Sequence, residues 1–175
     1  MKTLIVIDMQ NDFITGPLGT TEARAIVPNV KKKVEEYRKN GYKIVFTRDT
    51  HDNYYHNTPE GKKLPVKHCI EDTDGWQIGI EVTPDNYEFI NKTSFGYADW
   101  KETFPDYYFN SEDDKIELIG VCTDICVVSN ALILKATYPN ANITVDASCC
   151  AGSTPERHKA ALEVMKSCQI NVIGE

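Results

Sequence analysis

Three residues of types that suit nucleophilic catalysis each follow a short apolar run in the sequence. Asp8 and Lys92 come directly after two of these runs, and Cys126 lies a few residues beyond a third. A cysteine that attacks an acyl carbon needs a lowered pKa or a nearby base, and then an acid for the leaving group. We therefore consider Cys126 as a nucleophile, Asp8 as its base, and Lys92 as the cation that keeps Asp8 ionised.

Cys126 lies in the segment KIELIGVCTDICVVSN, residues 115–130, where an apolar run leads into an expected helix. Thr123 and Asp124 are residue types that often cap the N-terminus of a helix, so Cys126 would lie in the first turn. Backbone N–H groups and the helix dipole stabilise a thiolate there. An ordinary buried cysteine is the alternative for this stretch taken alone, because free cysteine is among the residues most often buried.

Side chains that can ligate metals gather after another apolar run. The polar stretch 52–85 lacks hydrophobic periodicity, and loops of this length are uncommon unless they are functional or disordered. Most of the histidines lie in or beside it, together with two carboxylates: His51, His56, His68, Asp49 and Glu60. Such a concentration after the end of a strand predicts a metal site.

The elements that must position these residues alternate between strands and helices. Apolar runs predict strands at residues 4–7, 43–47, 87–91, 116–121, 142–145 and 169–173. Hydrophobic periodicity and capping residues predict helices at 21–40, 123–138 and 154–168. This alternation predicts an α/β fold with three α/β/α layers and a mainly parallel six-stranded sheet. Because parallel strands end at one edge of such a sheet, Asp8, Lys92 and Cys126 should meet there.

Length and composition predict one globular domain over residues 1–175. The chain has 41% hydrophobic and 26% charged residues and a formal net charge of −7. The negative charge disfavours nucleic acid and anionic membranes as partners, and no apolar stretch reaches the ~18 residues of a membrane span. The N-terminal residues do not resemble a secretory signal, so we expect a cytoplasmic protein whose cysteines are thiols.

Taken together, the motifs of the chain resemble the isochorismatase-like cysteine hydrolase superfamily, and within it the nicotinamidase/pyrazinamidase branch. The motifs are VIDMQNDF at 6–13, TRDTH at 47–51, PVKHC at 65–69, NKTSF at 91–95 and GVCTDICV at 120–127. The resemblance covers essentially the whole chain and implies a Rossmann-like sheet topology. It also implies an Asp-Lys-Cys catalytic triad at Asp8, Lys92 and Cys126, with a non-prolyl cis peptide bond between Val121 and Cys122.

The resemblance further implies a divalent metal ion, with zinc expected first and iron or manganese as alternatives. Asp49, His51 and His68 match ligands of the nicotinamidases. For the fourth ligand we favour Glu60 over His56, because the Pro-Glu pair has the spacing of the branches that use a carboxylate. The alternative is a loop without metal, as in isochorismatase and several amidase branches.

By resemblance, we expect a metal-dependent amidohydrolase that cleaves a small-molecule carboxamide through a thioester, first of all nicotinamide to nicotinate and ammonia, a reaction of NAD salvage. Backbone N–H groups of Cys122 and Cys126 would form the oxyanion hole. Phe13 is the best-placed aromatic residue to stack on a flat substrate, and Phe95 is a weaker candidate that we expect rather in the core. Family members commonly form dimers or tetramers, so we expect a homo-oligomer.

The main departure from the family pattern is Cys122, which stands where relatives usually have a small, alanine-like residue. This difference leaves open a ureido acid, a carbamoyl amino acid or another small amide as the substrate. An alternative of another class is a thiol redox switch that uses Cys122 and Cys126, with Cys149 and Cys150 as further thiols. A third alternative is a catalytically inactive binding module.

Overall fold

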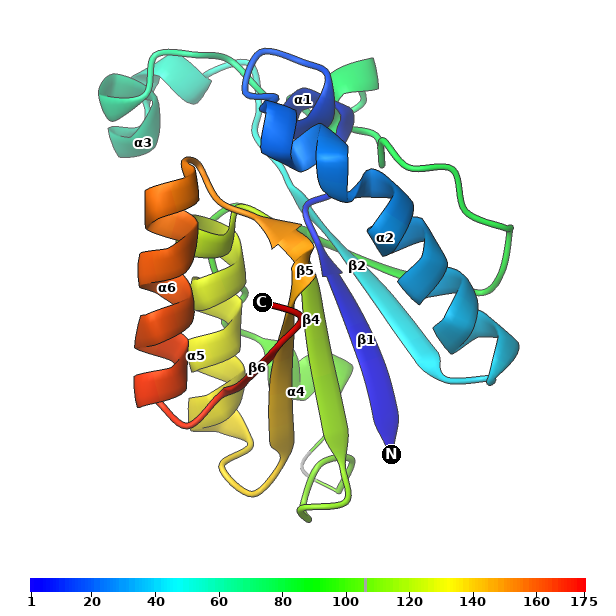
Figure 1. Cartoon of the computed structure of the whole chain (residues 1–175). Helices are drawn as coiled ribbons and strands as arrows, with labels where there is room; N and C mark the ends of the chain where they lie inside the picture. The colour runs from blue at the N-terminus through cyan, green and yellow to red at the C-terminus, as the bar shows by residue number, and fades with distance from the viewer. Residues whose placement is uncertain (106) are drawn as a thin grey trace.

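The computed structural model describes residues 1–105 and 107–175, and at its centre lies a parallel β-sheet with helices on both faces (Figure 1). The strands are β1 (Lys2–Ile7), β2 (Lys43–Asp49), β3 (Glu88–Lys92), β4 (Lys115–Val121), β5 (Asn142–Ala151) and β6 (Asn171–Ile173). Their order across the sheet is β3-β2-β1-β4-β5-β6, and every pairing is parallel. The predicted three-layer fold around a six-stranded parallel sheet is confirmed.

Helices of different lengths connect the strands and form the two outer layers. Helix α2 (Thr21–Lys39) covers one face of the sheet, and α5 (Val128–Thr137) and α6 (Pro155–Ser167) cover the other (Figure 1). The shorter elements are α1 (Asn11–Ile14), η1 (Tyr55–Asn57), α3 (Pro59–Lys63), η2 (Asp74–Trp76), α4 (Trp100–Thr103) and η3 (Thr123–Val127). The long connection between β2 and β3 thus contains only short helical turns, as its lack of periodicity predicts.

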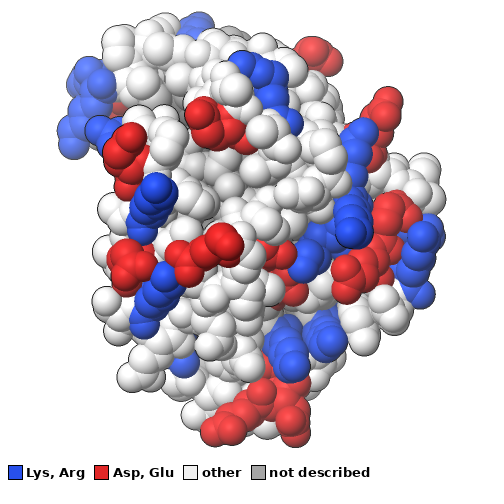
Figure 2. Space-filling view, viewed as in Figure 1, with Lys and Arg blue, Asp and Glu red and all other residues white. Residues whose placement is uncertain are grey.

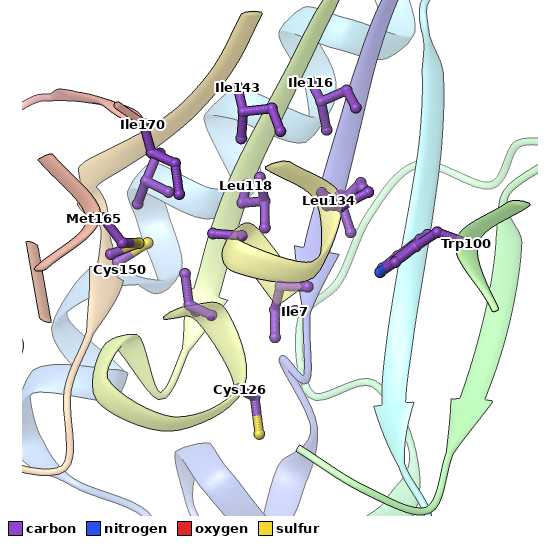
Figure 3. Packing of buried hydrophobic residues seen from close by; sticks show 14 of the residues in the cluster. Ile7, Trp100, Ile116, Leu118, Cys126, Leu134, Ile143, Cys150, Met165 and Ile170 are labelled. Atoms are coloured by element: carbon purple, nitrogen blue, oxygen red, sulfur yellow. The ribbon is translucent and has the colours of Figure 1, made fainter. Parts of the chain in front are cut away.

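Strand β1 separates two hydrophobic clusters, because successive side chains of a strand point to opposite faces. Leu4 and Val6 pack on the side of α2, whereas Ile5 and Ile7 pack on the other side with Leu134 of α5 (Figure 3). All of these side chains are fully buried. A continuous apolar run therefore fills both core layers, and its carboxyl end delivers Asp8 to the edge of the sheet.

Strand β5 is much longer than the predicted strand at 142–145, so the prediction that it ends before Asp146 is wrong. Asp146 stays within the strand because its carboxylate has partners outside it. Lys33 Nζ lies 2.9 Å from Asp146 Oδ2, and Ser148 Oγ donates a hydrogen bond of 2.6 Å to Asp146 Oδ1. The longer β5 carries the chain to the carboxyl edge of the sheet.

The charged surface of the molecule is mixed. On the face shown in Figure 2, acidic and basic side chains lie interspersed among uncharged ones, as suits a chain with 26% charged residues. Among the described residues, no helix combines the length and the apolar character that crossing a membrane would require.

Gly120 lies at the closest approach between β4 and the end of β1. Its φ is 119°, and a Cβ atom there would lie only 2.1 Å from the carbonyl oxygen of Ile7. Only glycine adopts this conformation readily and leaves room for the neighbouring main chain. The contact sets the start of η3 beside Asp8, because Gly120 pairs with Ile7.

We expect Gly120→Ala to lower the free energy of unfolding by about 3 kcal/mol or more, since backbone strain adds to a clash with the main chain of β1. Gly41→Ala is the matched control. Gly41 also has a positive φ, 68°, but a Cβ atom there would have no other atom within 4 Å, so alanine should cost only about 1 kcal/mol. Chemical denaturation of both variants measures the difference, and equal losses would contradict the steric explanation.

Candidate active site

Asp8, Lys92 and Cys126 meet at the carboxyl edge of the sheet: Asp8 follows β1, Lys92 is the last residue of β3, and Cys126 lies in η3 beyond β4. Lys92 Nζ lies 2.6 Å from Asp8 Oδ2 and 3.6 Å from Cys126 Sγ. The Asp8 and Lys92 side chains are 0% and 1% exposed, and Cys126 is buried as well. Figure 3 shows the sulfur of Cys126 pointing away from the packed core, toward the carboxyl ends of the strands. One ammonium group therefore contacts both a carboxylate and a thiol.

The ion pair determines the charge states of Asp8 and Lys92. Burial raises the pKa of Asp8, and attraction to the Lys92 ammonium group opposes that rise. Burial lowers the pKa of Lys92, but the negative groups around it, Asp8 first, outweigh burial and raise the pKa overall. Thr47 Oγ1 also donates a hydrogen bond of 2.6 Å to Asp8 Oδ1. Lys92 is thus an ammonium group at neutral pH, and Asp8 is a carboxylate with increased affinity for a proton.

The surroundings of the Cys126 thiol favour its neutral form. Burial raises its pKa well above the usual value, and the charge of Asp8 adds to this rise more than Lys92 offsets it. This direction is opposite to the lowered pKa that a helix N-terminus alone would produce, and it agrees with the expectation that the thiol needs Asp8 as a base. A neutral thiol beside a carboxylate requires that carboxylate as a base when it attacks.

Cys126 lies in a π-helical turn, η3, and not in the first turn of an ordinary α-helix. π-Helical turns are rare overall, but those that do occur are often found at functional sites. Cys122 occupies the N-cap position without a capping side-chain hydrogen bond, so the prediction that Thr123 or Asp124 caps the helix is wrong. The peptide bond between Val121 and Cys122 is cis, as the family resemblance implies.

Four side chains with metal-binding atoms converge next to the triad. They are Asp49, His51, Glu60 and His68, and one ligand atom from each lies within 4.8 Å of the others. His51 Nε2 and His68 Nε2 lie 2.9 Å and 3.4 Å from Asp49 Oδ2. Each of the two nitrogens lies 3.7 Å from Glu60 Oε1. Two imidazoles and two carboxylates suit a divalent ion such as zinc, iron or manganese.

The surroundings prepare these side chains to bind a cation. Burial raises the pKa of Asp49, but hydrogen bonds with His51 and His68 outweigh it and lower the pKa overall, so Asp49 is ionised. His68 Nδ1 lies 2.8 Å from the carbonyl oxygen of Val66. A carbonyl can only accept, so Nδ1 carries a proton, and Nε2, which faces Asp49, is the ring nitrogen that would ligate a metal ion. His56 is exposed and lies outside the group, which supports Glu60 as the fourth ligand.

Gln10 and Asp12 are two further residues of this region that our sequence analysis missed. The Gln10 amide donates hydrogen bonds of 2.8 Å and 2.9 Å to the carbonyl oxygens of Asp49 and Trp76, and it accepts one of 2.8 Å from Asp49 N. Asp12 Oδ2 accepts a hydrogen bond of 2.7 Å from Cys69 N, next to His68 in sequence. These side chains fix the main chain beside two candidate ligands. The signal for them was polar residues directly after a buried strand.

Cys126 and all four residues of the metal-binding group line one cavity of about 780 Å³. This volume is in the range of small-molecule sites. Phe13 is 9% exposed and lines the cavity, with its ring centroid 5.6 Å from that of His68. Phe95 is 45% exposed and also lines the cavity, so the expectation that it belongs to the core is wrong. Cys122 is half-buried in the same wall as Cys126.

Comparisons with known proteins find relatives that match most or all of the chain. A model of the isochorismatase domain matches residues 2–174. A probable inactive nicotinamidase of Arabidopsis thaliana is 32% identical, and the match covers 94% of this chain and 87% of the relative. The nicotinamidase of Saccharomyces cerevisiae is 25% identical over the whole of both chains. The crystal structure of the pyrazinamidase of Pyrococcus horikoshii in complex with zinc has a TM-score of 0.86 and 26% identity, with 99% of each chain covered.

The choice between Glu60 and His56 is testable by metal binding. We expect Glu60→Gln to weaken Zn²⁺ binding by at least about tenfold, because the site loses a charged ligand atom. His56→Gln is the matched control and should leave the affinity unchanged, since His56 is exposed and outside the group. Calorimetric titration of the metal-free protein measures both affinities. A larger loss in His56→Gln than in Glu60→Gln would assign the fourth ligand to His56 instead.

Proposed function

The chain belongs to the isochorismatase domain family and is an amidohydrolase, and we propose that it cleaves a small carboxamide through a thioester on Cys126, with nicotinamide as the first substrate. The observation that carries this proposal is the contact of Lys92 with both Asp8 and Cys126. Two proteins that are similar along the whole chain are named nicotinamidase and pyrazinamidase, which supports an aromatic carboxamide as the substrate.

The first half of the proposed reaction forms the thioester. Asp8 takes the thiol proton of Cys126, and the sulfur attacks the carboxamide carbon. The carbonyl oxygen becomes an oxyanion, which the backbone N–H groups of Cys122 and Cys126 stabilise. The protonated Asp8 then returns its proton to the amide nitrogen, the C–N bond breaks, and ammonia leaves. Lys92 keeps its charge throughout and neutralises whichever of the two groups is anionic.

The second half of the reaction releases the acid. Asp8, again a carboxylate, takes a proton from a water molecule as the water oxygen attacks the thioester carbon. The C–S bond breaks, and the proton held by Asp8 returns to the sulfur of Cys126. The balance is one amide and one water consumed, and one carboxylic acid and one ammonia formed.

We propose that Asp49, His51, Glu60 and His68 hold a divalent metal ion, with zinc first because a similar pyrazinamidase contains it. Such an ion, when bound, supplies a Lewis-acid position that can hold an electron-pair donor of the substrate, such as a pyridine nitrogen. Phe13 lies against His68 and presents its ring to a flat substrate in the cavity.

Several observations favour a hydrolase over a thiol redox switch. Burial raises the pKa of Cys122 to about 12 and that of Cys126 well above its usual value, so neither thiol is ready for exchange without a base. Cys149 and Cys150 pack in different hydrophobic clusters on opposite faces of the sheet, so their adjacency in sequence does not bring their sulfurs together.

The catalytic roles are testable by substitution. We expect Cys126→Ala to reduce amide hydrolysis by at least about 10³-fold and Asp8→Asn by about 10²–10⁴-fold, because the nucleophile or its base is lost. Cys168→Ser removes an exposed thiol away from the cavity and should leave the rate unchanged. Ammonia release measures all three rates, with circular dichroism to check folding. A folded Cys126→Ala variant that hydrolyses the amide at the wild-type rate would exclude the proposed nucleophile.

The substrate is testable by an ammonia-release screen over nicotinamide, pyrazinamide, ureido acids and carbamoyl amino acids. We expect the highest kcat/KM for nicotinamide, because Phe13 and the metal-binding group suit a flat ring with a basic nitrogen. Cys122 in the cavity wall is the residue most able to change this preference, and Cys122→Ala tests its effect. Hydrolysis of a ureido acid together with no turnover of nicotinamide would overturn the substrate while leaving the mechanism in place.

A further inference from the structure

We propose that the connection between β5 and α6 is a brace that holds the turn of Cys126 in its reactive position, with His158 and Ser153 as positioning residues. The brace is defined as residues 152–158. It contacts η3 through two consecutive residues, Thr123 and Asp124, which are the residues whose types suggest helix caps. The inference rests on the proposed role of Cys126. Ser153 lines the cavity, whereas His158 does not, so His158 is the residue that tests positioning apart from substrate contact.

The first contact of the brace joins Thr123 to α6. Thr123 is the first residue of η3, and its side chain is fully buried. Its hydroxyl oxygen lies 2.7 Å from His158 Nδ1. Burial lowers the pKa of His158, so the imidazole is neutral at pH 7 and can accept the hydroxyl proton at Nδ1. His158 is half-buried, and its imidazole binds the turn that carries Cys126.

The second contact lies on the next residue of the turn. Both carboxylate oxygens of Asp124 accept hydrogen bonds from Ser153: Oδ1 from the backbone N–H at 2.7 Å and Oδ2 from the hydroxyl at 2.6 Å. A carboxylate held at both oxygens by one residue is fixed in direction as well as in distance. Thr123 and Asp124 therefore attach η3 to the brace at two successive positions.

The brace is held in place by packing on α6 and by its connection to β5. A Cβ atom on Gly152 would lie 2.8–2.9 Å from the backbone nitrogen, Cα and Cβ of His158, so the main chain packs directly on the first turns of α6. Just before Gly152, Ala151 pairs with Val121, the last residue of β4. The contact before the cis peptide thus comes from the last residue of β5, and the contacts after it come from the brace that follows directly. A movement of the brace would therefore move the turn of Cys126.

Hydrogen bonds from outside the turn matter here, because η3 lacks the side-chain hydrogen bond that usually caps the N-terminus of a helix. Its N-cap residue, Cys122, makes no capping side-chain hydrogen bond, and the side chains that commonly cap a helix bind the brace instead. A nucleophile that is displaced by ~1 Å can lose about 10²-fold in rate. Hydrogen bonds that fix Thr123 and Asp124 thereby act on the rate of attack by Cys126.

The test compares His158→Leu with two matched variants. We expect His158→Leu to lower kcat on the amide substrate by about 10- to 100-fold and to change KM by less than about twofold, because no substrate contact is lost. His158→Asn should recover most of kcat, since its Oδ1 follows Cγ as Nδ1 does in histidine and can accept the same proton. Lys159→Leu changes the next, exposed residue of α6 and should behave as the wild type.

A second measurement needs no substrate. Alkylation of Cys126 by iodoacetamide, followed by mass spectrometry of its peptide, should slow by about tenfold in His158→Leu and remain unchanged in Lys159→Leu. Thr123→Val removes the same hydrogen bond from the other side and should show the same losses, with no further loss in the double variant. If His158→Leu fails to fold, Thr123→Val decides the question alone.

Wild-type kcat and a wild-type alkylation rate in folded His158→Leu and Thr123→Val would overturn the brace. Equal losses in Lys159→Leu would overturn it too, because the effect would then come from α6 in general. Slower alkylation in both variants, with no amide hydrolysed even by the wild type, would support the brace and reject the proposed function. The two proposals therefore fail separately.

Discussion

The buried ion pair between Asp8 and Lys92 is the interaction on which the arrangement of the site depends. Asp8 follows β1 and Lys92 is the last residue of β3, and these two strands are not neighbours, because β2 lies between them. Thr47 of that middle strand donates a hydrogen bond to Asp8, so three strand ends are tied together. Removing one partner of such a pair leaves an unpaired buried charge at a cost of about 3–5 kcal/mol. The pair thus constrains the fold and the chemistry at once.

The same pair explains how a thiol with a raised pKa can act as a nucleophile. Lys92 contacts Asp8 at 2.6 Å and Cys126 at 3.6 Å, so a proton that passes from the thiol to the carboxylate moves a negative charge between two contacts of one ammonium group. No new charge is separated in the low-dielectric interior. The site can therefore keep a neutral resting thiol and still form a thiolate at the moment of attack. Lys92 also lies 3.6 Å from Asp49 Oδ1, which couples this charge to the metal-binding group.

Much of this arrangement is predictable from the sequence, because it follows from simple alternation. Apolar runs locate the strands, and the rule that parallel strands end at one edge brings Asp8, Lys92 and Cys126 together. Properties that depend on distant partners are not predictable in this way. The protonation state of Cys126 depends on its burial and on the charge of Asp8, and the length of β5 depends on Lys33 of α2, which neutralises Asp146 in the middle of the strand.

The prediction that Thr123 or Asp124 caps the helix is also wrong because of distant partners, which override the local preferences of these residue types. Their residue types are those of helix caps, and in a helix without other contacts they would satisfy its first N–H groups. Here they bind His158 and Ser153, which lie far later in the chain, and η3 forms a π-helical turn. Local sequence preferences are most often overridden where a functional geometry must be held. Because Thr123 and Asp124 bind distant residues and do not cap the helix, tertiary contacts set the position of the turn of Cys126.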